Sequence, residues 1–483
     1  MFLGIDVGTS EVKAVLLSEQ HKLVASAGSV LAIARPQPGH SEQNPQDWWT
    51  ATCKALGKLQ NAAPKAYAGV TALGLSGQMH GAVLLDGQNQ VLRPAILWND
   101  TRASQECADM MAQMPSLPGV AGSLVMPGFT APKLRWVAKH EPQVFAQVAQ
   151  VLLPKDFVRL QLTDECVCDM SDASGTAWLD VQKRDWSDDL LKLTGLTRQH
   201  MARLVEGSAS SGVLLPGVAT QLGLKPGIVV AGGGGDNAAS AVGMGAVEPE
   251  QGFLSLGTSG VLFVVTPSYQ PNAASATHAF CHAVPGRWHQ MSVMLSAASC
   301  LQWATGLLGA ASTAELEAKA NGLDAARRAT APLFLPYLSG ERTPHNSASV
   351  RGSFHHLSHD TDAASLAYAV MEGVSFGLND GLAALQAAGV QTQRLSLVGG
   401  GARSSFWAQQ LASALGIEIV THLGSEAGGA LGAARLGWLA AGGNLAEVCI
   451  APEIANVFTP RLTERSYLLP RYQQFKSLYK KSL

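Results

Sequence analysis

The chain of 483 residues carries 34 basic and 36 acidic side chains, which gives a formal net charge of −2. This balance argues against a strongly basic nucleic-acid-binding protein, because no net positive field attracts a phosphate backbone. At about 150 residues per domain the length allows two to three domains. Charged residues make up only 14% of the chain and hydrophobic residues 47%, a composition that favours large buried cores over disorder.

The amino terminus, the cysteines and the most apolar stretch bear on location. Residues 1–10 (MFLGIDVGTS) show no basic segment ahead of an apolar one, so no secretory signal is expected. The seven cysteines are scattered, which favours reduced thiols in a cytoplasm. Residues 227–247 are apolar but contain four consecutive glycines and a central Asp236, and we reject them as a membrane span.

The first predicted element is a β-hairpin. Residues 2–7 (FLGIDV) form its first strand and residues 12–17 its return strand, and the tight turn between them contains Gly8, Thr9 and Ser10. The same pattern recurs about 250 residues later, with strands over residues 253–256 and 261–265 and a turn that contains Gly257, Thr258 and Ser259. Two matched hairpins predict two lobes, residues 1–245 and residues 246–483.

Strands and helices alternate between and after these hairpins. The pattern predicts strands over residues 70–76, 82–86, 94–100, 150–155, 228–231 and 395–400. It predicts helices over residues 47–59, 130–139 and 403–415, and an exposed terminal helix within residues 459–483. Such alternation favours an α/β architecture.

Glycines cluster where predicted strands end. The strand over residues 228–231 runs into four glycines, and Asp236 and Asn237 then open a helix of small residues. A glycine loop before a helix N-terminus offers free backbone N–H groups and lets an anion approach closely. Asp236 is then either an N-cap or a carboxylate that faces a phosphate cleft, where it accepts a proton from a substrate hydroxyl or holds a metal ion. The residues alone leave both roles open.

Two further glycine clusters lie at residues 399–401, after a strand, and at residues 426–432, in a helical setting. Residues 399–404 together with Glu418 have the approximate spacing of a dinucleotide-binding fingerprint. The third glycine is missing, however, and Glu418 lies inside the next strand rather than at its end. Nicotinamide binding is therefore disfavoured.

The two Gly-Thr-Ser turns have a joint explanation. Each turn presents backbone N–H and hydroxyl donors to phosphate oxygens, and Asp6, just before the first turn, is placed to hold Mg²⁺. Lys13 on the return strand is placed to reach the same anion. One such turn alone is an ordinary hairpin loop, but two matched copies favour a phosphate grip. The P-loop sequence GxxxxGK[ST] does not occur, so the grip belongs to another fold.

These motifs resemble those of the FGGY carbohydrate kinases. Residues 6–10 (DVGTS) and 256–259 (LGTS) are similar to the two phosphate loops of that family, and residues 397–404 (LVGGGARS) to its adenosine motif. Residues 128–137 (GFTAPKLRWV) are similar to the first family signature. The resemblance covers nearly the whole chain, and it implies an α/β, two-lobed, actin-like or ribonuclease-H-like duplicated ATPase fold with a central cleft between the lobes.

The second family signature, around residues 352–372, is imperfect. His356 stands where glycine is usual, and Ser365 where a carboxylate, an amide or histidine is usual. These departures put the local turn in doubt and leave the family resemblance intact.

Within the family, several segments are most similar to the members that phosphorylate D-xylulose. These segments are residues 75–81, 96–102, 293–299 and 334–345. The resemblance implies ATP-dependent phosphorylation of D-xylulose at its terminal hydroxyl, which gives D-xylulose 5-phosphate in xylose catabolism. Ribulose, gluconate or another polyol stays open as the substrate, and so does a non-catalytic, actin-like nucleotide switch.

The resemblance also implies roles for individual residues. Asp236 would be the general base, the sugar would contact Met79, His80, Asp236 and Asn237, and Mg²⁺ would lie near Asp6. Contacts with ATP would come from Gly8, Thr9, Ser10, Lys13, Gly257, Thr258, Ser259, Gln302, Gly400, Gly401 and Ser404.

Arg342 is expected to form a structural salt bridge with Glu341 or Asp100. The low charge content favours a buried subunit interface, and we expect a homodimer without nucleic-acid or membrane partners.

Overall fold

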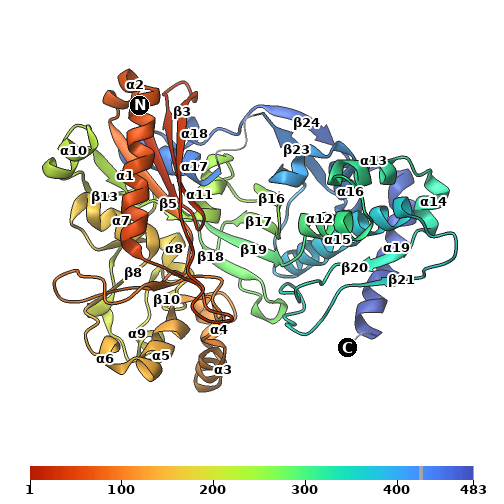
Figure 1. The fold of residues 1–483 in the computed structure, drawn as a ribbon, viewed down its shortest axis with the longest axis horizontal. Coiled ribbons are helices and arrows are strands. Elements are labelled where there is room, and N and C mark those ends of the chain that lie inside the picture. Colours follow the sequence, from red (N-terminus) through yellow and green to blue (C-terminus); the bar gives the residue numbers. More distant parts are fainter. Residues whose placement is uncertain (424–427, 482–483) are drawn as a thin grey trace.

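Both predicted hairpins form, and each begins a sheet of its own. The structure is a computed structural model that describes residues 1–423 and 428–481. The two sheets have seven strands each and belong to two lobes that lie side by side, with the N-terminus in one and the C-terminal helix in the other (Figure 1). The predicted glycine-rich segment at residues 426–432 is described only from Gly428 onwards.

The first sheet grows from the first hairpin, in which β1 (Phe2–Val7) pairs antiparallel with β2 (Glu11–Leu17). On its other side β1 pairs in parallel with β5 (Ala72–Gly77). The register places Asp6 opposite Lys13 on one neighbour and opposite Ser76 on the other. The sheet is completed by β3 (Leu23–Val30), β13 (Ser210–Val213), β14 (Val229–Ala231) and the short β15 (Gly234–Gly235).

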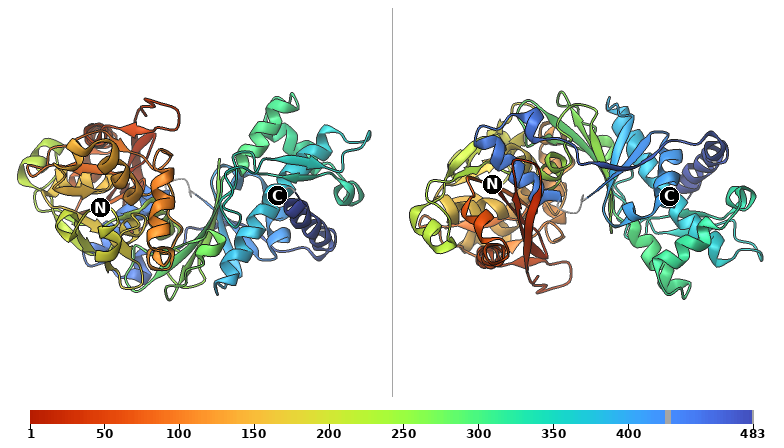
Figure 2. Two further views of the ribbon diagram at one scale, coloured as in Figure 1. Left: turned by 90° about the horizontal axis from the view of Figure 1, so that it is seen from below. Right: turned by 90° about the horizontal axis from the view of Figure 1, so that it is seen from above.

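The second sheet repeats the arrangement. In the second hairpin β16 (Gly252–Leu256) pairs antiparallel with β17 (Gly260–Thr266), and β16 pairs in parallel with β22 (Arg394–Val398) as β1 does with β5. The sheet also contains β18 (His278–Cys281), β19 (Trp288–Met294), β23 (Glu418–His422) and β24 (Ile454–Phe458). The duplication thus extends beyond the hairpins, and in both views of Figure 2 the green strands of this sheet lie on the side of the second lobe that is nearer the first.

Helices cover the sheets. The first lobe contains α1 (Pro45–Ala62), α2 (Pro64–Ala68), α3 (Ser104–Gln113), α4 (Leu117–Ala121), α5 (Thr130–His140), α6 (Pro142–Phe145), α7 (Pro154–Thr163), α8 (Met170–Ser174), α9 (Asp188–Lys192), α10 (Pro216–Leu222) and α11 (Asp236–Gly243). The later helices are α12 (Ala298–Leu307), α13 (Thr313–Asn321), α14 (Ala325–Thr330), α15 (Ala363–Ala387), α16 (Ser405–Leu415), α17 (Gly428–Ala440), α18 (Leu445–Val448) and α19 (Leu462–Lys481). The remaining strands lie outside the two large sheets and are short, namely β4 (Glu42–Gln43), β6 (Val83–Leu85), β7 (Ala95–Ile96), β8 (Gln150–Leu152), β9 (Val167–Asp169), β10 (Leu179–Asp180), β11 (Asp185–Trp186), β12 (Arg203–Val205), β20 (Leu333–Leu335) and β21 (Ser353–His355).

Helix α17 crosses back from the second half of the chain to the first lobe, where it packs on β1, β5 and α11 (Figure 1). The contact is close because glycines face it. A Cβ atom at Gly4 would overlap the carbonyl oxygen of Ala430, and one at Gly74 would overlap that of Ala433. The predicted boundary between the two lobes, at residues 245 and 246, stays a prediction.

Some predicted elements differ from the structure. The strand predicted over residues 94–100 shrinks to β7, and the one over residues 150–155 ends at Leu152 because Pro154 begins α7. The predicted terminal helix forms as α19, but one face of it is buried rather than exposed. Tyr472 and Phe475 of α19 are buried in the core of the second lobe, and Arg471 donates to the buried carboxylate of Glu372.

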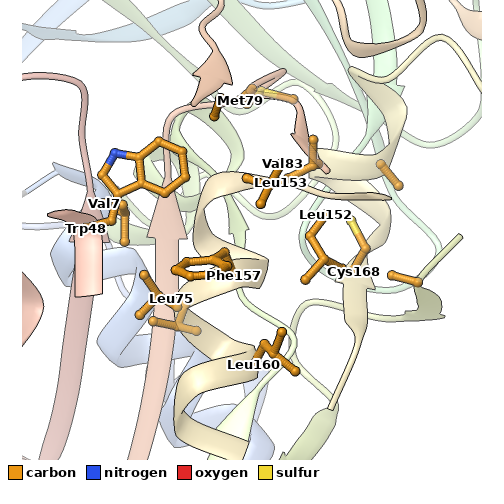
Figure 3. Close-up of a cluster of buried hydrophobic side chains, with 14 of the residues drawn as sticks. Val7, Trp48, Leu75, Met79, Val83, Leu152, Leu153, Phe157, Leu160 and Cys168 are labelled. Carbon is orange, nitrogen blue, oxygen red and sulfur yellow. The ribbon is translucent and has the colours of Figure 1, made fainter. Parts of the chain in front are cut away.

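A hydrophobic cluster lies beneath the ends of β1 and β5. Figure 3 shows Val7 and Leu75 from these strands beside Phe157 of α7, with Met79 at one end of the cluster. This packing fixes the loop that follows β5. Within residues 1–423 and 428–481, none of the helices is both long and apolar enough to cross a bilayer. All seven cysteines carry free thiols.

Candidate active site

Asp236 lies at the point where β15 ends and α11 begins. Gly235 occupies the N-cap position, and Asp236 is the first helical residue, so the interpretation of Asp236 as an N-cap is wrong. Its Oδ1 accepts from the backbone N–H of Asn237 (2.7 Å) and from Nδ2 of the same residue (2.9 Å). The strand ahead of Asp236 is held by the Ser171 hydroxyl, which accepts from the Gly235 N–H at 3.0 Å.

Two cavities meet at this position. A larger one of about 830 Å³ and a smaller one of about 350 Å³ share Asp236, Asn237 and Ser255 in their walls. Both have walls from the first lobe and from the second sheet, so the shared residues lie at the junction of a cleft between the lobes. A side chain at this junction is placed to contact a ligand in either cavity.

The smaller cavity is lined by Met79, His80, Trp98, Phe129, Asp236, Asn237, Ser255, Ser259, Val261, His278, Phe280, Met291, Val293 and Arg342. Most of this wall is apolar or aromatic, and a few polar groups converge in it. That is the usual character of a site for a small polar ligand.

His80 is a neutral hydrogen-bonding group in the smaller cavity. Burial lowers its pKa to about 3, and its Nδ1 lies 2.6 Å from the carbonyl oxygen of Gly175. Because a carbonyl only accepts, Nδ1 carries the hydrogen and Nε2 is left as an acceptor. The ring also stacks on Phe129, with ring centroids 4.5 Å apart.

Lys133 holds the loop that carries His80. This fully buried side chain on α5 donates to the carbonyl oxygens of His80 (2.9 Å) and Ile96 (3.1 Å). Burial holds its pKa well below the ordinary range. The segment over residues 128–137 therefore supports the site by fixing the backbone of His80.

Asp6 and Asp236 form a pair of interacting carboxylates. Burial raises the pKa of Asp6, and its Oδ1 is buried without a hydrogen-bond partner. Burial and the negative charge of Asp6 raise the pKa of Asp236 to about 6. At Gly429, a Cβ atom would lie 3.1 Å from Oδ1 of Asp6, so glycine leaves this face of the carboxylate open.

This arrangement fits Mg²⁺, which proteins often hold through one or two carboxylates together with water and substrate phosphates. Within the described part of the chain, no group of three or more His, Cys, Asp or Glu residues could hold a metal by itself. An ion at Asp6 would therefore take most of its ligands from water and a bound phosphate.

The first Gly-Thr-Ser turn is tied to the smaller cavity. The Thr9 hydroxyl donates to Oε1 of Gln78 (3.0 Å) and accepts from Nε1 of Trp98 (3.0 Å). In the second turn, the carbonyl of Thr258 accepts from the Ser299 hydroxyl at 2.7 Å, and Ser259 lines the smaller cavity. Both turns thus lie beside the junction.

The larger cavity is lined by residues 397–400, with Ala402, Arg403 and Ser405 beyond them and Thr421, His422 and Asn456 from the sheet edge. Of the predicted nucleotide residues, Gly400 lines it. Gly401 instead packs against the second hairpin, where a Cβ atom would overlap Leu256.

The other predicted nucleotide residues lie outside both cavity walls, namely Gly8, Thr9, Ser10, Lys13, Gly257, Thr258, Gln302 and Ser404. Ser404 is the N-cap of α16, where its hydroxyl accepts from the Trp407 N–H (2.9 Å) and donates to Glu317 (2.5 Å). Gln302 is exposed on α12. Their roles as nucleotide contacts stay predictions.

The sequence patterns missed several residues of the smaller cavity, namely Trp98, Phe129, His278 and Arg342. Trp98 and Phe129 stood in segments recognised for other reasons. The signal for Arg342 was a charge in an apolar stretch of a charge-poor chain, and it was misread as structural.

The salt bridge predicted for Arg342 does not form. Among the described residues no carboxylate lies within ion-pair distance of its guanidinium. Asp100 pairs instead with Arg102 at 2.7 Å. The Glu341 carboxylate accepts from the backbone N–H groups of Leu295 (2.9 Å) and Arg342 (2.7 Å).

Known proteins match the chain over most of its length. Residues 1–243 match the FGGY family of carbohydrate kinases, N-terminal domain, and residues 252–441 match its C-terminal domain. A xylulose kinase of Escherichia coli (strain K12) is 49% identical over 485 residues, which covers 100% of this chain and 99% of the relative.

Solved structures match as well. The crystal structure of a xyloylose kinase from Brucella ovis is 48% identical with a TM-score of 0.96 and covers 99% of both chains. That of a xylulose kinase from Rhodospirillum rubrum is 26% identical with a TM-score of 0.91, over 99% of this chain and 98% of the other. The predicted two-lobed, actin-like α/β fold is confirmed.

Proposed function

The chain belongs to the FGGY family of carbohydrate kinases, and on this basis we propose that it transfers the γ-phosphoryl group of ATP to the terminal hydroxyl of D-xylulose. The products are D-xylulose 5-phosphate and ADP. The observation that carries the proposal is the position of Asp236, a carboxylate with a raised pKa at the junction of two cavities. The relatives named xylulose kinase support the choice of sugar.

ATP occupies the larger cavity in this proposal. The glycines that follow β22 leave bare backbone at its wall, against which a purine ring can lie. The triphosphate then extends toward the junction, where the two Gly-Thr-Ser turns offer backbone and hydroxyl donors. Lys13, which lies opposite Asp6 in the hairpin, adds a positive charge near the same place.

D-Xylulose occupies the smaller cavity. Its hydroxyl groups donate to Nε2 of His80, and Asn237 contributes an amide beside the base. Met79, Phe129 and Trp98 cover the carbon chain and exclude water, which would otherwise compete as the phosphoryl acceptor.

Asp236 acts as the general base. As the oxygen of the C5 hydroxyl bonds to the γ-phosphorus, its proton passes to the carboxylate, and the bond from the γ-phosphorus to the bridging oxygen of ADP breaks in line. With a pKa of about 6 the carboxylate is ionised at neutral pH, and its pKa is near enough to the working pH for it to accept the proton efficiently. Positioning and charge stabilisation supply most of the rate enhancement in such transfers.

Mg²⁺ completes the proposed site. Asp6 would hold it, directly or through water, and the ion would neutralise charge on the phosphates when bound. The unpartnered Oδ1 of Asp6 supports this placement. We extend the proposal to a homodimer, which the low charge content of 14% favours, and to a cytoplasmic location, which the free cysteines favour.

A coupled assay of ADP release tests the proposal. The panel contains D-xylulose, D-ribulose, gluconate and xylitol, with and without Mg²⁺. We expect the highest kcat/KM with D-xylulose and no turnover without the metal. Fast turnover with another sugar would replace the substrate, and slow turnover that ignores every sugar would indicate a nucleotide switch instead.

A further inference from the structure

The chemistry of the proposed product restricts the form of the sugar that binds. A 2-ketopentose closes its furanose ring by attack of O5 on C2, and the ring form therefore has no free hydroxyl at C5. Phosphorylation at C5 requires the open chain. The end remote from the reaction then presents a C2 carbonyl beside a C1 hydroxyl, two oxygens on adjacent carbons.

Arg342 is a cation in the smaller cavity that lacks a protein partner. Its partly buried side chain lines the wall with His80 and His278. In the described part of the chain, no hydrogen bond and no ion pair engages its guanidinium, and the nearby Glu341 acts on it only through its charge. A cation out of bulk water without a direct partner is unfavourable, so a residue kept in this state points to a ligand.

The backbone on both sides of Arg342 is fixed to the second sheet. The Thr343 N–H donates to the carbonyl of Val293 at 3.1 Å, and the Thr343 hydroxyl accepts from the Val293 N–H at 3.1 Å. On the other side, Glu341 accepts from the Leu295 N–H. Burial raises the pKa of Glu341 to about 7, so this carboxyl is only partly ionised at neutral pH. The backbone that carries the guanidinium is therefore fixed, and the neighbouring carboxyl neutralises its charge only in part.

Asp236 lines both cavities and so lies where the smaller cavity meets the larger one, whereas Arg342 lines only the smaller cavity. The positive charge of Arg342 acts on the histidines, where it contributes to lowering the pKa of His80 and of His278. The charge that acts on Asp236 is that of Asp6. A sugar whose C5 hydroxyl reaches Asp236 thus directs its C1–C2 end past His80 toward Arg342.

We infer that Arg342 recognises the open-chain hydroxyketone end of the substrate by donating two hydrogen bonds, one to the C2 carbonyl oxygen and one to the C1 hydroxyl oxygen. The planar guanidinium offers paired donors that match two neighbouring oxygens. The assignment rests on the proposed function and deepens it, because it makes Arg342 the residue that selects a ketose over a polyol.

The test compares Arg342→Met with the wild-type enzyme on matched sugars. D-Xylulose carries both oxygens, 1-deoxy-D-xylulose lacks the C1 hydroxyl, and xylitol lacks the C2 carbonyl. We expect Arg342→Met to lower kcat/KM for D-xylulose by about 10²- to 10³-fold, mainly through KM. The wild-type preference for D-xylulose over the 1-deoxy sugar should shrink to a few-fold in the variant.

Two further variants keep the test decisive. Arg342→Lys retains the charge without the paired donors, and we expect it to recover only part of the lost affinity. Arg351→Met is the matched control, because Arg351 is an exposed arginine of the same segment, and its kinetics should equal those of the wild type. Thermal unfolding and the KM for ATP should be unchanged in all three variants.

The outcomes separate the inference from the proposed function. If the wild-type enzyme does not phosphorylate D-xylulose, the proposed function fails. If it does, and folded Arg342→Met or Arg342→Lys keeps the same preference between D-xylulose and its 1-deoxy analogue, the role of Arg342 is overturned while the function stands.

Discussion

Asp6 at the end of β1 and Asp236 at the start of α11 interact through their charges, and the negative charge of Asp6 adds to burial in raising the pKa of Asp236 to about 6. The two carboxylates come from segments 230 residues apart in the chain. The residue proposed to hold the metal ion thereby also sets the basicity of the residue proposed to accept the proton.

This interaction predicts the pH dependence of catalysis. Asp236 must be ionised to accept a proton, so activity is full above its pKa and falls as the pH drops through about 6. In metal-free Asp6→Asn the neighbouring negative charge is absent, so the pKa of Asp236 falls below its value in the metal-free wild type. A pH titration of the Asp236 carboxyl by carbon-13 NMR in the two metal-free proteins measures the shift, and an unchanged pKa would contradict the coupling.

Removal of the proposed base should affect chemistry far more than binding. We expect Asp236→Asn to lower kcat by about 10²- to 10⁴-fold, with a small change in the KM for ATP. Asp360→Asn, at an exposed position of the other lobe, is the matched control and should retain full activity. Near-normal sugar phosphorylation by Asp236→Asn would rule out the base assignment.

Lys133→Met tests the support behind His80. The substitution removes one of two donors from each buried carbonyl, because the Thr130 hydroxyl still donates to His80 and the Ala82 N–H to Ile96. The cost is about 0.5–1.5 kcal/mol for each lost hydrogen bond. We expect a lower melting temperature and a higher KM for the sugar, with the KM for ATP retained. Lys54→Met, at an exposed position of α1, should change neither; equal effects of the two substitutions would refute the supporting role.

Glycine substitutions test the close packing of α17. Gly4→Ala places a Cβ atom where the Ala430 carbonyl lies, and we expect a loss of about 1–3 kcal/mol in the free energy of unfolding. Gly57→Ala, inside α1 with no atom within 4 Å of the added methyl, should instead gain about 0.5–1 kcal/mol. Urea titration of both variants measures the difference, and a neutral Gly4→Ala would mean that the helix is free to move away.

The parts of the site that could be predicted are those coded by local sequence. Each Gly-Thr-Ser turn lies between two strands whose apolar residues are visible in the sequence. The strand, glycines and helix start around Asp236 are also consecutive in the sequence. The cavity wall that includes Trp98, His278 and Arg342 is not local, because these residues are brought together by pairing between distant strands and by loops that dock on them.

Ser404 and Arg342 show the same limit. Ser404 has a residue type that suits a phosphate contact and an N-cap equally, and only the position of Glu317 and the Trp407 N–H reveals that its hydroxyl serves as the cap. Glu341 is next to Arg342 in the sequence, but its carboxylate accepts from the backbone N–H groups of Leu295 and Arg342, and Asp100 pairs with Arg102. The partners of a charged side chain follow from the fold as a whole.

The return of α17 to the first lobe makes that lobe dependent on the C-terminal third of the chain for its completion. A fragment ending near residue 243 would leave the backbone strip around Gly4 and Gly74 bare, with no side chains of its own to cover it. During synthesis on the ribosome, the first lobe therefore cannot complete its packing until residues 428–440 have emerged. By then most of the second lobe has also been synthesised, so the two lobes complete their folding at the same stage.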